Sequence, residues 1–300
     1  MSLIAVNKLN KSYGSLKAVS DFSFTVDRGE ILALVGPDGA GKTTIFRSLC
    51  NLIEYESGEI NIAGYGHDQF DRIKPLLGYM PQIFSLYPDL SVDENLVFYA
   101  GLFGLSKEQF NCKKKRLYEF SGLGPFAKRR ASALSGGMKQ KLALSCCLVH
   151  DPEVLLLDEP TTGVDPLSRR QFWDILRNLR ETGSAIVVST PYMDEVALSN
   201  RAIFIYQGKK LTEGTPQRLV DQFQGNVYRA RVFPSADCME QLSHIEGLTA
   251  RRFGSSIHIY LSGAGSIERF HSVLLPLGIK PEDIEPVRPD LEDTFIQLIG

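Results

Sequence analysis

The apolar positions of the chain follow two alternating patterns that together predict an α/β fold. Strands are predicted at residues 4–9, 19–26, 31–35, 59–63, 154–157, 185–188 and 202–205. Alternation of apolar and polar residues indicates half-buried strands, whereas the unbroken ILALV of Ile31–Val35 is typical of a central one. Between the later runs, apolar residues recur at helical spacing, as at Phe172, Ile175, Leu176 and Leu179. This order predicts a parallel sheet covered by helices.

A helical region interrupts this α/β pattern after about residue 83, where the strand periodicity disappears. Ser91 followed by Glu94 fits a capping box, in which each residue satisfies a backbone N–H of the other at the start of a helix. We therefore expect a helical subdomain at about residues 83–150, inserted into an α/β unit of residues 1–222.

A second, smaller domain is indicated by the periodicities that restart after residue 222. They predict a strand at 227–233, a helix at 236–244, two strands around Gly254, a helix at 267–275 and a strand near Ile284. The order β-α-β-β-α-β is that of a ferredoxin-like unit. We therefore expect a small α+β ferredoxin-like C-terminal domain at residues 226–300, behind a linker at residues 222–225.

Composition and charge narrow the classes of function. The 33 Lys and Arg residues against 35 Asp and Glu give a net charge of -2, which supplies no general attraction for nucleic acid. No apolar run reaches the roughly 18 residues that span a bilayer, and the N-terminus lacks the features of a secretion signal. We expect a cytoplasmic protein whose five cysteines, without a CxxC pair, are reduced thiols, with Cys146 and Cys147 as core residues.

A phosphate-binding loop is the first candidate site. Gly36, Pro37, Asp38, Gly39, Ala40, Gly41, Lys42 and Thr43 fit the pattern G-x-x-x-x-G-K-[ST]. The motif falls between the ILALV strand and a helix-like segment, so backbone N–H groups and the helix N-terminus would surround an anion. We expect Lys42 to contact the β- and γ-phosphates of ATP and Thr43 to ligate Mg²⁺, with Thr44 beside them. The alternative is an ordinary glycine-rich turn.

An acidic pair ends a later buried strand, in VLLLDE at residues 154–159. Asp158 is expected to hold Mg²⁺ through water, and Glu159 to polarise the attacking water as a general base. Alone, such a pair could equally be an ordinary junction between a strand and a turn. Its combination with the phosphate-binding loop favours a catalytic role.

The segment LSGGMKQ, at residues 134–140, brings in a resemblance to a known family. Together with the two motifs above, it resembles the signature of ATP-binding cassettes, and the similarity runs in the correct order over residues 3–220. The resemblance implies a P-loop NTPase cassette with a mixed sheet core, an antiparallel β subdomain and an inserted helical subdomain. VGPDGAGKTT, GYMPQ and LSGGMKQKL resemble the N-terminal cassette of tandem multidrug exporter ATPases, and PDLEDTFIQLIG resembles a tail found in ABC-2 type systems.

The resemblance also implies roles for single residues. Tyr13 looks like the aromatic residue that stacks on adenine, although it could simply be an aromatic residue on an edge strand. Gln82 looks like the glutamine that touches Mg²⁺ in catalysis and senses the membrane partner. Asp165 resembles the aspartate that communicates across a cassette dimer. Because two cassettes of this family close head to tail, Ser135, Gly136 and Gly137 would cap the ATP of the partner cassette.

One departure from the family pattern bears on activity. Pro191 stands where a histidine usually reaches the γ-phosphate, and proline has neither a side-chain donor nor a backbone N–H. We expect slow turnover of ATP in the site of Lys42 and Glu159, unless Ser189, Thr190 or Tyr192 substitutes in part. Asp38, where Asn or Ser is more usual, is a smaller departure because that position contributes through its backbone.

The expected function is that of an ATPase that powers an exporter of drugs or other small molecules. It would close on a second cassette, whether identical, separate or fused, and sit at the inner face of the membrane on an ABC-2 type permease. The apolar residues Phe84, Leu86 and Tyr87 would receive a short helix of that permease, unless they pack in the core. The alternatives are a regulatory ATP-binding half of an asymmetric pair, or a cassette of DNA repair or translation. The last is disfavoured by the lack of zinc-spaced cysteines, heptad arms and basic charge, so no nucleic acid partner is expected.

Overall fold

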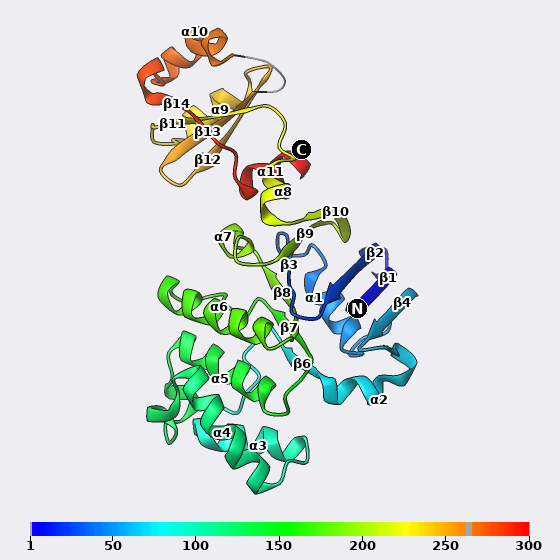
Figure 1. The fold of residues 1–300 in the computed structure, drawn as a ribbon. Coiled ribbons are helices and arrows are strands. Elements are labelled where there is room, and N and C mark those ends of the chain that lie inside the picture. Colours follow the sequence, from blue (N-terminus) through cyan, green and yellow to red (C-terminus); the bar gives the residue numbers. More distant parts are fainter. Residues whose placement is uncertain (1, 262–265, 300) are drawn as a thin grey trace. The chain divides into compact units, whose positions relative to one another are not determined.

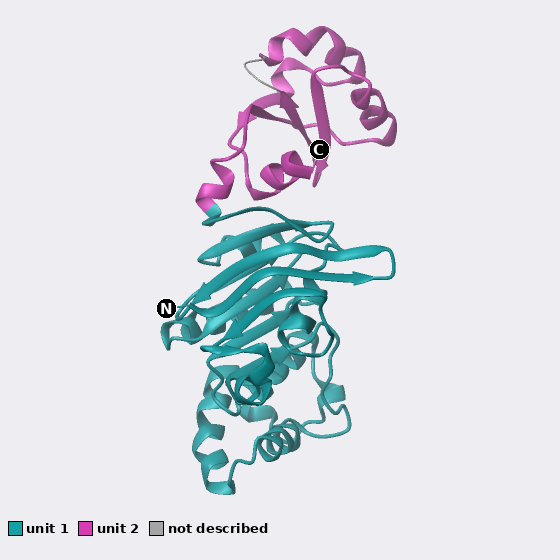
Figure 2. Cartoon of the chain, turned by 90° about the vertical axis from the view of Figure 1, so that its right-hand side faces the viewer, with its two compact units in different colours: residues 1–216 teal, residues 217–300 magenta. Residues whose placement is uncertain are grey.

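The computed structural model describes residues 2–261 and 266–299 and divides into two compact units, residues 1–216 and 217–300 (Figure 2). The elements of the first unit are β1 (Ser2–Tyr13), β2 (Leu16–Asp27), β3 (Ile31–Val35), α1 (Lys42–Leu49), β4 (Ser57–Ile62), β5 (Tyr65–Gly66), α2 (Phe70–Ile73), β6 (Leu77–Met80), α3 (Val92–Leu102), α4 (Lys107–Ser121), α5 (Gly136–Leu148), β7 (Val154–Asp158), α6 (Pro166–Glu181), β8 (Ala185–Thr190), α7 (Met193–Val196), β9 (Arg201–Tyr206) and β10 (Lys209–Gly214) (Figure 1). Among the described residues, no helix has the length and apolar character needed to cross a membrane.

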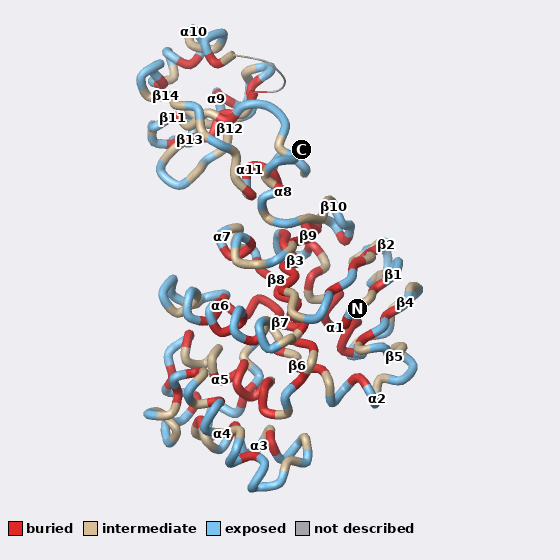
Figure 3. Tube along the Cα trace, in the orientation of Figure 1, coloured by how far each residue is buried: buried red, intermediate tan, exposed pale blue. Residues whose placement is uncertain are grey.

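A six-stranded sheet forms the centre of the first unit, in the order β10-β9-β3-β8-β7-β6. The strands from β9 to β6 are parallel, and β10 pairs antiparallel at the edge. β3, β7 and β8 are buried along their whole length (Figure 3). In β7, Leu155 and Leu157 join the core beneath the helical region, whereas Val154 and Leu156 face the core that contains α1 and the antiparallel sheet. The predicted parallel sheet with helical cover is therefore confirmed.

A four-stranded antiparallel sheet, in the order β2-β1-β4-β5, completes this unit. β1 and β2 are 12 residues each and pair as one long hairpin, well beyond the predicted strands at 4–9 and 19–26. The outer half of the hairpin is largely exposed, so its strands lack the apolar alternation that marks a buried face. The strands β5, β6 and β10 lie outside the predicted elements. β5 and β6 have only two and four residues, too few for a periodic pattern, and the edge strand β10 carries Leu211 as its one apolar residue.

The helical region between β6 and β7 contains α3, α4 and α5. The capping box expected at α3 is present: Glu94 N donates to Ser91 Oγ at 3.2 Å, and Ser91 N donates to Glu94 Oε2 at 2.8 Å. Asn95 is fully buried in the same helix, where its side chain accepts from Tyr87 N and donates to Tyr87 O, each at 3.0 Å. This amide fixes the loop that enters α3.

The boundary between the units lies earlier than the predicted linker at residues 222–225. The division falls after Pro216, so most of the short helix α8 (Pro216–Val220) belongs to the second unit. The expected linker is not free, because Gln224 N donates to Gln297 Oε1 at 2.9 Å and Gln297 Nε2 donates to Gln224 O at 2.6 Å. These contacts tie the segment to the C-terminal helix, which the sequence does not place beside it.

The second unit follows the predicted order of strands and helices. Its elements after α8 are β11 (Asn226–Ala230), α9 (Ala236–Ser243), β12 (Leu248–Phe253), β13 (Ser256–Leu261), α10 (His271–Leu274), β14 (Ile284–Val287) and α11 (Leu291–Ile299). The strands form an antiparallel sheet in the order β12-β13-β11-β14. The predicted helix at 267–275 is instead a series of short turns around α10, and Pro276 lacks the N–H that would continue a helix at its end. Met1, residues 262–265 and Gly300 of the expected domains lie outside the described residues.

A buried carboxylate docks α11 onto this sheet. Asp293 is 0% exposed, and its Oδ1 lies 2.9 Å from His258 Nδ1 and accepts a hydrogen bond from Tyr260 at 2.8 Å. Its Oδ2 accepts from Asp290 N at 2.9 Å. The ring of Phe253 stacks on His258 with centroids 3.9 Å apart. His258 is thus a structural residue that holds the last helix in place.

Replacing Asp293 with Ala is expected to loosen α11, because the buried His258 and the half-buried Tyr260 would lose their acceptor. Each such group costs about 1–3 kcal/mol. Hydrogen exchange of the α11 amides should become about tenfold faster or more, while the exposed Glu246→Ala leaves it unchanged. Unaltered exchange in Asp293→Ala would contradict this role.

Candidate functional site

The predicted phosphate-binding loop connects β3 to α1, and its glycines are required by close backbone contacts. Gly41 caps α1 with a φ of 106°, and a Cβ there would lie 2.3 Å from the carbonyl oxygen of Ala18. A Cβ on Gly36 would lie 2.2 Å from the carbonyl oxygen of Ile205. The first N–H groups of a helix lack intrahelical partners, so the start of α1 is suited to bind an anion. Thr43 and Thr44 lie in this first turn.

Lys42 and Glu159 form a buried ion pair beside this loop. Lys42 is 4% exposed and Glu159 is 5% exposed, with 3.2 Å between Nζ and Oε1. The ammonium also donates to the carbonyl oxygens of Gly36 at 2.8 Å and Pro37 at 3.1 Å. Gln82, which follows β6, donates from Nε2 to Glu159 Oε2 at 2.9 Å. Three predicted site residues from distant parts of the sequence therefore meet at one carboxylate.

One hydroxyl organises both members of the acidic pair. Ser189 Oγ, at the end of β8, donates to Asp158 Oδ1 at 2.6 Å and accepts from Glu159 N at 2.9 Å. Glu159 has a φ of 48°, in the left-handed region that costs a residue with a side chain about 1–3 kcal/mol. The hydrogen bond from its N–H helps to hold this conformation, which directs consecutive carboxylates into different surroundings.

The site of Asp158 fits a divalent cation. Asp158 is fully buried, and its Oδ2 has no hydrogen-bond partner among the described residues. Burial raises the pKa of Asp158, against the lowering effect of the Ser189 and Thr43 hydroxyls. A buried carboxylate oxygen without a protein donor, next to a threonine hydroxyl, is the hard oxygen ligand that Mg²⁺ prefers.

The residues of the LSGGM motif lie in a second group, against the loop that contains Asp165. Ser135 caps α5 and accepts from Met138 N at 3.4 Å, while Asp165 caps α6 and accepts from Ser168 N at 2.9 Å. Hydrogen bonding to the side chain and backbone of Ser168 lowers the pKa of Asp165. A Cβ on Gly137 would lie 2.6 Å from the Ser168 side chain, so the two helix starts are in contact.

The two groups are separate within the described chain. No hydrogen bond or ion pair among the described residues joins Ser135, Gly136, Gly137 or Asp165 to the group of Lys42 and Glu159. Ser135, Gly136 and Asp165 are exposed, in contrast to the buried ion pair. The second group thus presents two helix N-termini to the surroundings of the protein.

Tyr13 and Asp38 are exposed. Tyr13 ends β1 with 46% of its surface accessible, and the ammonium of Lys11 lies 5.2 Å from its ring centroid. The same hairpin reaches the phosphate-binding loop through Ala18, which contacts Gly41. The side chain of Asp38 makes no hydrogen bond or ion pair with the part of the chain that the structure describes.

The loop at Pro191 is held by a carboxylate that the sequence analysis missed. Glu195 is 2% exposed and accepts from Thr161 Oγ1 and Thr190 Oγ1, each at 2.6 Å. It thereby links the segment after Glu159 to the segment after β8. No local sequence signal marks Glu195, because its two partners are 34 and 5 residues away.

These contacts use the hydroxyls that could substitute for a histidine near Pro191. Ser189 and Thr190 are fully buried, and their hydroxyls donate to Asp158 and Glu195. The ring of Tyr192 packs against the guanidinium of Arg169 at 4.5 Å. Pro191 itself is exposed.

Comparisons with known proteins agree with this geometry. A family model described as "ABC transporter" matches residues 19–162. The probable multidrug ABC transporter ATP-binding protein YbhF of Escherichia coli K12 is 37% identical over the whole of this chain, which spans about half, 52%, of that relative. The linearmycin resistance ATP-binding protein LnrL of Bacillus subtilis is 30% identical, covering 99% of this chain and 98% of its own length.

A solved structure described as the dimeric post-hydrolysis state of the ATP-binding cassette MJ0796, bound to ADP and Pi, matches with a TM-score of 0.63. It is 26% identical and covers 71% of this chain and 98% of its own. The agreement of fold, motifs and relatives leads to one assignment. The chain belongs to the ABC transporter family and contains its ATP-binding cassette.

Proposed function

We propose that the chain hydrolyses ATP and powers an exporter by closing on a second cassette beneath a membrane subunit. The observation that carries this proposal is the meeting of Lys42, Gln82 and Glu159 beside the loop that ends at α1. The names of YbhF and LnrL, which refer to multidrug transport and linearmycin resistance, favour export of drugs or similar small molecules. An ABC-2 type permease is the proposed membrane partner, which would hold the chain at the inner face of the membrane.

The residues of the first group divide the work of hydrolysis. Lys42 and the N–H groups at the start of α1 bind the phosphates, and the ammonium stabilises their charge. Glu159 accepts a proton from the attacking water, which Gln82 helps to orient. Thr43, Asp158 and Gln82 would hold Mg²⁺, which supplies further charge stabilisation on the phosphoryl oxygens. Tyr13 stacks on the adenine.

A second cassette completes each nucleotide site. Ser135 and Gly136 are exposed at the start of α5, where N–H groups can bind the phosphate of an ATP held by a partner. The dimer of the MJ0796 cassette supports such closure in a protein of this fold. Because the chain spans about half of YbhF, the partner in a longer protein could be its second half. Pro191 makes the two sites of such a pair unequal.

Single-turnover hydrolysis tests the catalytic assignment. We expect slow but measurable turnover by the wild type and at least about a 100-fold loss in Glu159→Gln, because the general base is removed. ATP binding, measured by equilibrium dialysis, should persist in that variant. The exposed Glu181→Gln serves as a matched control. Equal turnover in Glu159→Gln and the wild type would refute the assignment.

Pro191→His tests the inequality of the two sites. A histidine adds a donor near the γ-phosphate, so turnover should rise about tenfold or more. A silent wild type that is rescued by histidine would favour the second candidate function, a regulatory ATP-binding half. That candidate rests on the exposed Pro191 and on hydroxyls already used within the loop. No change on adding histidine would count against any catalytic role for this position.

Asp158→Asn tests the cation site through stability. Because burial raises the pKa of Asp158, its ionisation costs folding free energy as the pH rises through that pKa. The variant should therefore lose this decline in stability with pH, seen by thermal unfolding without Mg²⁺. It should also lose most of the stabilisation that Mg²⁺ adds in the presence of ATP. An intact Mg²⁺ effect would exclude Asp158 as a ligand.

The proposed contact with the membrane subunit is the exposed part of the loop after Gln82. Ile83 is 79% exposed and Tyr87 is 46% exposed, with the Tyr87 ring 4.6 Å from that of Phe98. Leu86, expected at this contact, is instead a buried core residue with 7% exposure, and Phe84 packs partly against the same core. The corrected surface consists of Ile83, Tyr87 and Phe98.

Replacing Ile83 and Tyr87 with Asp should release the chain from its membrane subunit, because charges would replace the apolar contact. We expect the wild type in the membrane fraction of its source cells and the double variant in the supernatant, with unchanged ATP binding. Leu52→Asp is the control, because the 61% exposure of Leu52 lies between those of Ile83 and Tyr87. Retention of the double variant on membranes would rule out this surface.

A further inference from the structure

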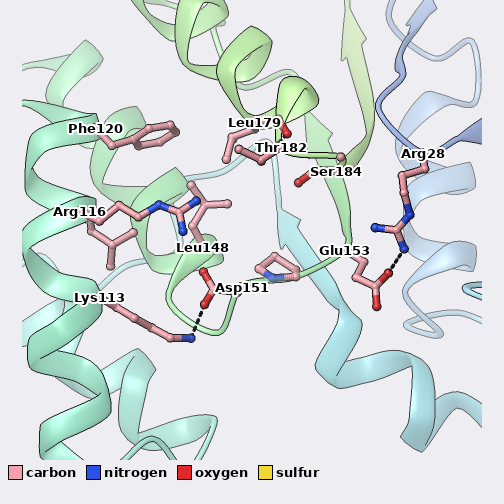
Figure 4. Close-up of a pocket in the computed structure, with 13 residues that line it drawn as sticks. Arg28, Lys113, Arg116, Phe120, Leu148, Asp151, Glu153, Leu179, Thr182 and Ser184 are labelled. Carbon is pink, nitrogen blue, oxygen red and sulfur yellow. Dashed lines mark hydrogen bonds and ion pairs between the residues drawn. The ribbon is translucent and has the colours of Figure 1, made fainter.

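A cavity of about 370 Å³ lies in the first unit, between α4 and the segments that precede β7 and β8 (Figure 4). Its volume falls in the range of small-molecule sites, about 300–1,000 Å³. Helix α4 contributes Lys113, Arg116, Leu117 and Phe120, which share one helix face by their spacing. None of the residues proposed to bind ATP lines this cavity.

The charges around the cavity leave one cation unpaired. Arg28 pairs with Glu153, and Lys113 pairs with Asp151 at 2.6 Å. Arg116 makes no ion pair or hydrogen bond with any residue that the structure describes, and its guanidinium extends alongside Leu148 in Figure 4. The lining therefore carries a net positive charge at a single guanidinium, a group that binds carboxylates through two parallel hydrogen bonds.

The rest of the lining is largely apolar. Leu117, Leu148 and Leu179 are nearly buried, and the ring of Phe120 forms a further wall beside them (Figure 4). Arg116 is an exposed residue, so an inorganic anion would leave the apolar walls unused, and a neutral apolar molecule would leave the guanidinium without a partner. One guanidinium beside apolar walls therefore favours a ligand with one negative group and a short hydrocarbon body.

We propose that this cavity binds a small organic carboxylate with an aliphatic or aromatic body, held by Arg116 and the three leucines. Resting on the proposed ATPase function, we further propose that the bound carboxylate slows ATP turnover. The reason is that three of the elements around the cavity begin or end beside a predicted site residue. α5 runs from the cap Ser135 to Leu148, α6 runs from the cap Asp165 past Leu179, and β7 follows Glu153 and ends at Asp158.

A ligand in this cavity would restrict movement of the helical region. It would bridge α4 to the C-terminal end of α6 and so hold the helical region against the sheet. The starts of α5 and α6, with Ser135 and Asp165, lie in contact and would meet the partner together in the proposed closure. Filling the cavity therefore lowers the population of the closed arrangement in proportion to the ligand's preference for the open one.

Isothermal titration of the purified chain with octanoate tests the binding site directly. We expect one saturable site per chain in the wild type and at least about tenfold weaker binding in Arg116→Gln, the change that loss of a charge-assisted contact produces. Lys115→Gln, on the same helix at 84% side-chain exposure, should bind as the wild type does. Octanamide, which lacks the charge, and acetate, which lacks the body, should bind much more weakly. Equal binding to wild type and Arg116→Gln, or no saturation, would overturn the site.

Turnover measured in parallel separates this inference from the proposed function. Octanoate should slow ATP hydrolysis by the wild type severalfold and leave Arg116→Gln unaffected at the same concentration. Octanoate binding that depends on Arg116 in a chain without ATPase activity would support the site while contradicting the proposed function. Hydrolysis that persists unchanged under saturating octanoate would overturn the proposed regulation.

Discussion

The buried ion pair between Lys42 and Glu159 is the interaction on which the nucleotide site depends. Each charge alone would cost several kcal/mol inside the protein, so each requires the other and the polar groups around them. Lys42 begins α1 after the loop that follows β3, and Glu159 directly follows β7, so the pair joins two segments whose strands are separated in the sheet by β8. In the proposed function, phosphate oxygens would replace Glu159 as the partner of the ammonium and leave Glu159 with Gln82, so ATP binding would free the proposed base.

Two hydroxyl groups of β8, the strand between β3 and β7, position further residues of the site. Ser189 forms hydrogen bonds with Asp158 and Glu159. Thr190, the last residue of the same strand, donates to Glu195. Pro191 follows Thr190 and has no backbone N–H, so replacing it breaks no backbone hydrogen bond. The loop is therefore positioned by its neighbours, and a histidine at position 191 could be accepted without disturbing the carboxylates. Slow turnover would then be a property of one missing donor in an otherwise ordered site.

The sequence predicts those parts of the fold and site in which local residues determine the structure. Ile31–Val35 is apolar throughout, which indicates a central strand, and it is buried from end to end. In the phosphate-binding loop that follows, only glycine fits beside Ile205 at position 36 and beside Ala18 at position 41. The edge strand β6 escapes because its four residues are too few for a periodic pattern, and the outer half of the β1–β2 hairpin escapes because strand pairing, rather than an apolar pattern, holds it. Glu195 escapes for the same reason, as it gains its role from Thr161.

The apolar residues of one short segment differ in their burial. Residues 83–87 suggest a single apolar surface, yet Leu86 packs inward while Ile83 and Tyr87 face solvent. The division is set by Asn95, which binds the backbone of Tyr87 on both sides and fixes the loop before α3.

The same reasoning connects the two ends of the cassette. A strand or helix transmits displacement along its length, because its backbone hydrogen bonds and packing resist bending. α5, α6 and β7 each carry a site residue at one end and border the cavity near Arg116 at the other. Because of this shared arrangement, both ATP and a cavity ligand could change the position of the helical region relative to the sheet. In the proposed mechanism, ATP with a second cassette would favour the closed position and a ligand between α4 and α6 the open one, so the two would compete through the protein without sharing a contact.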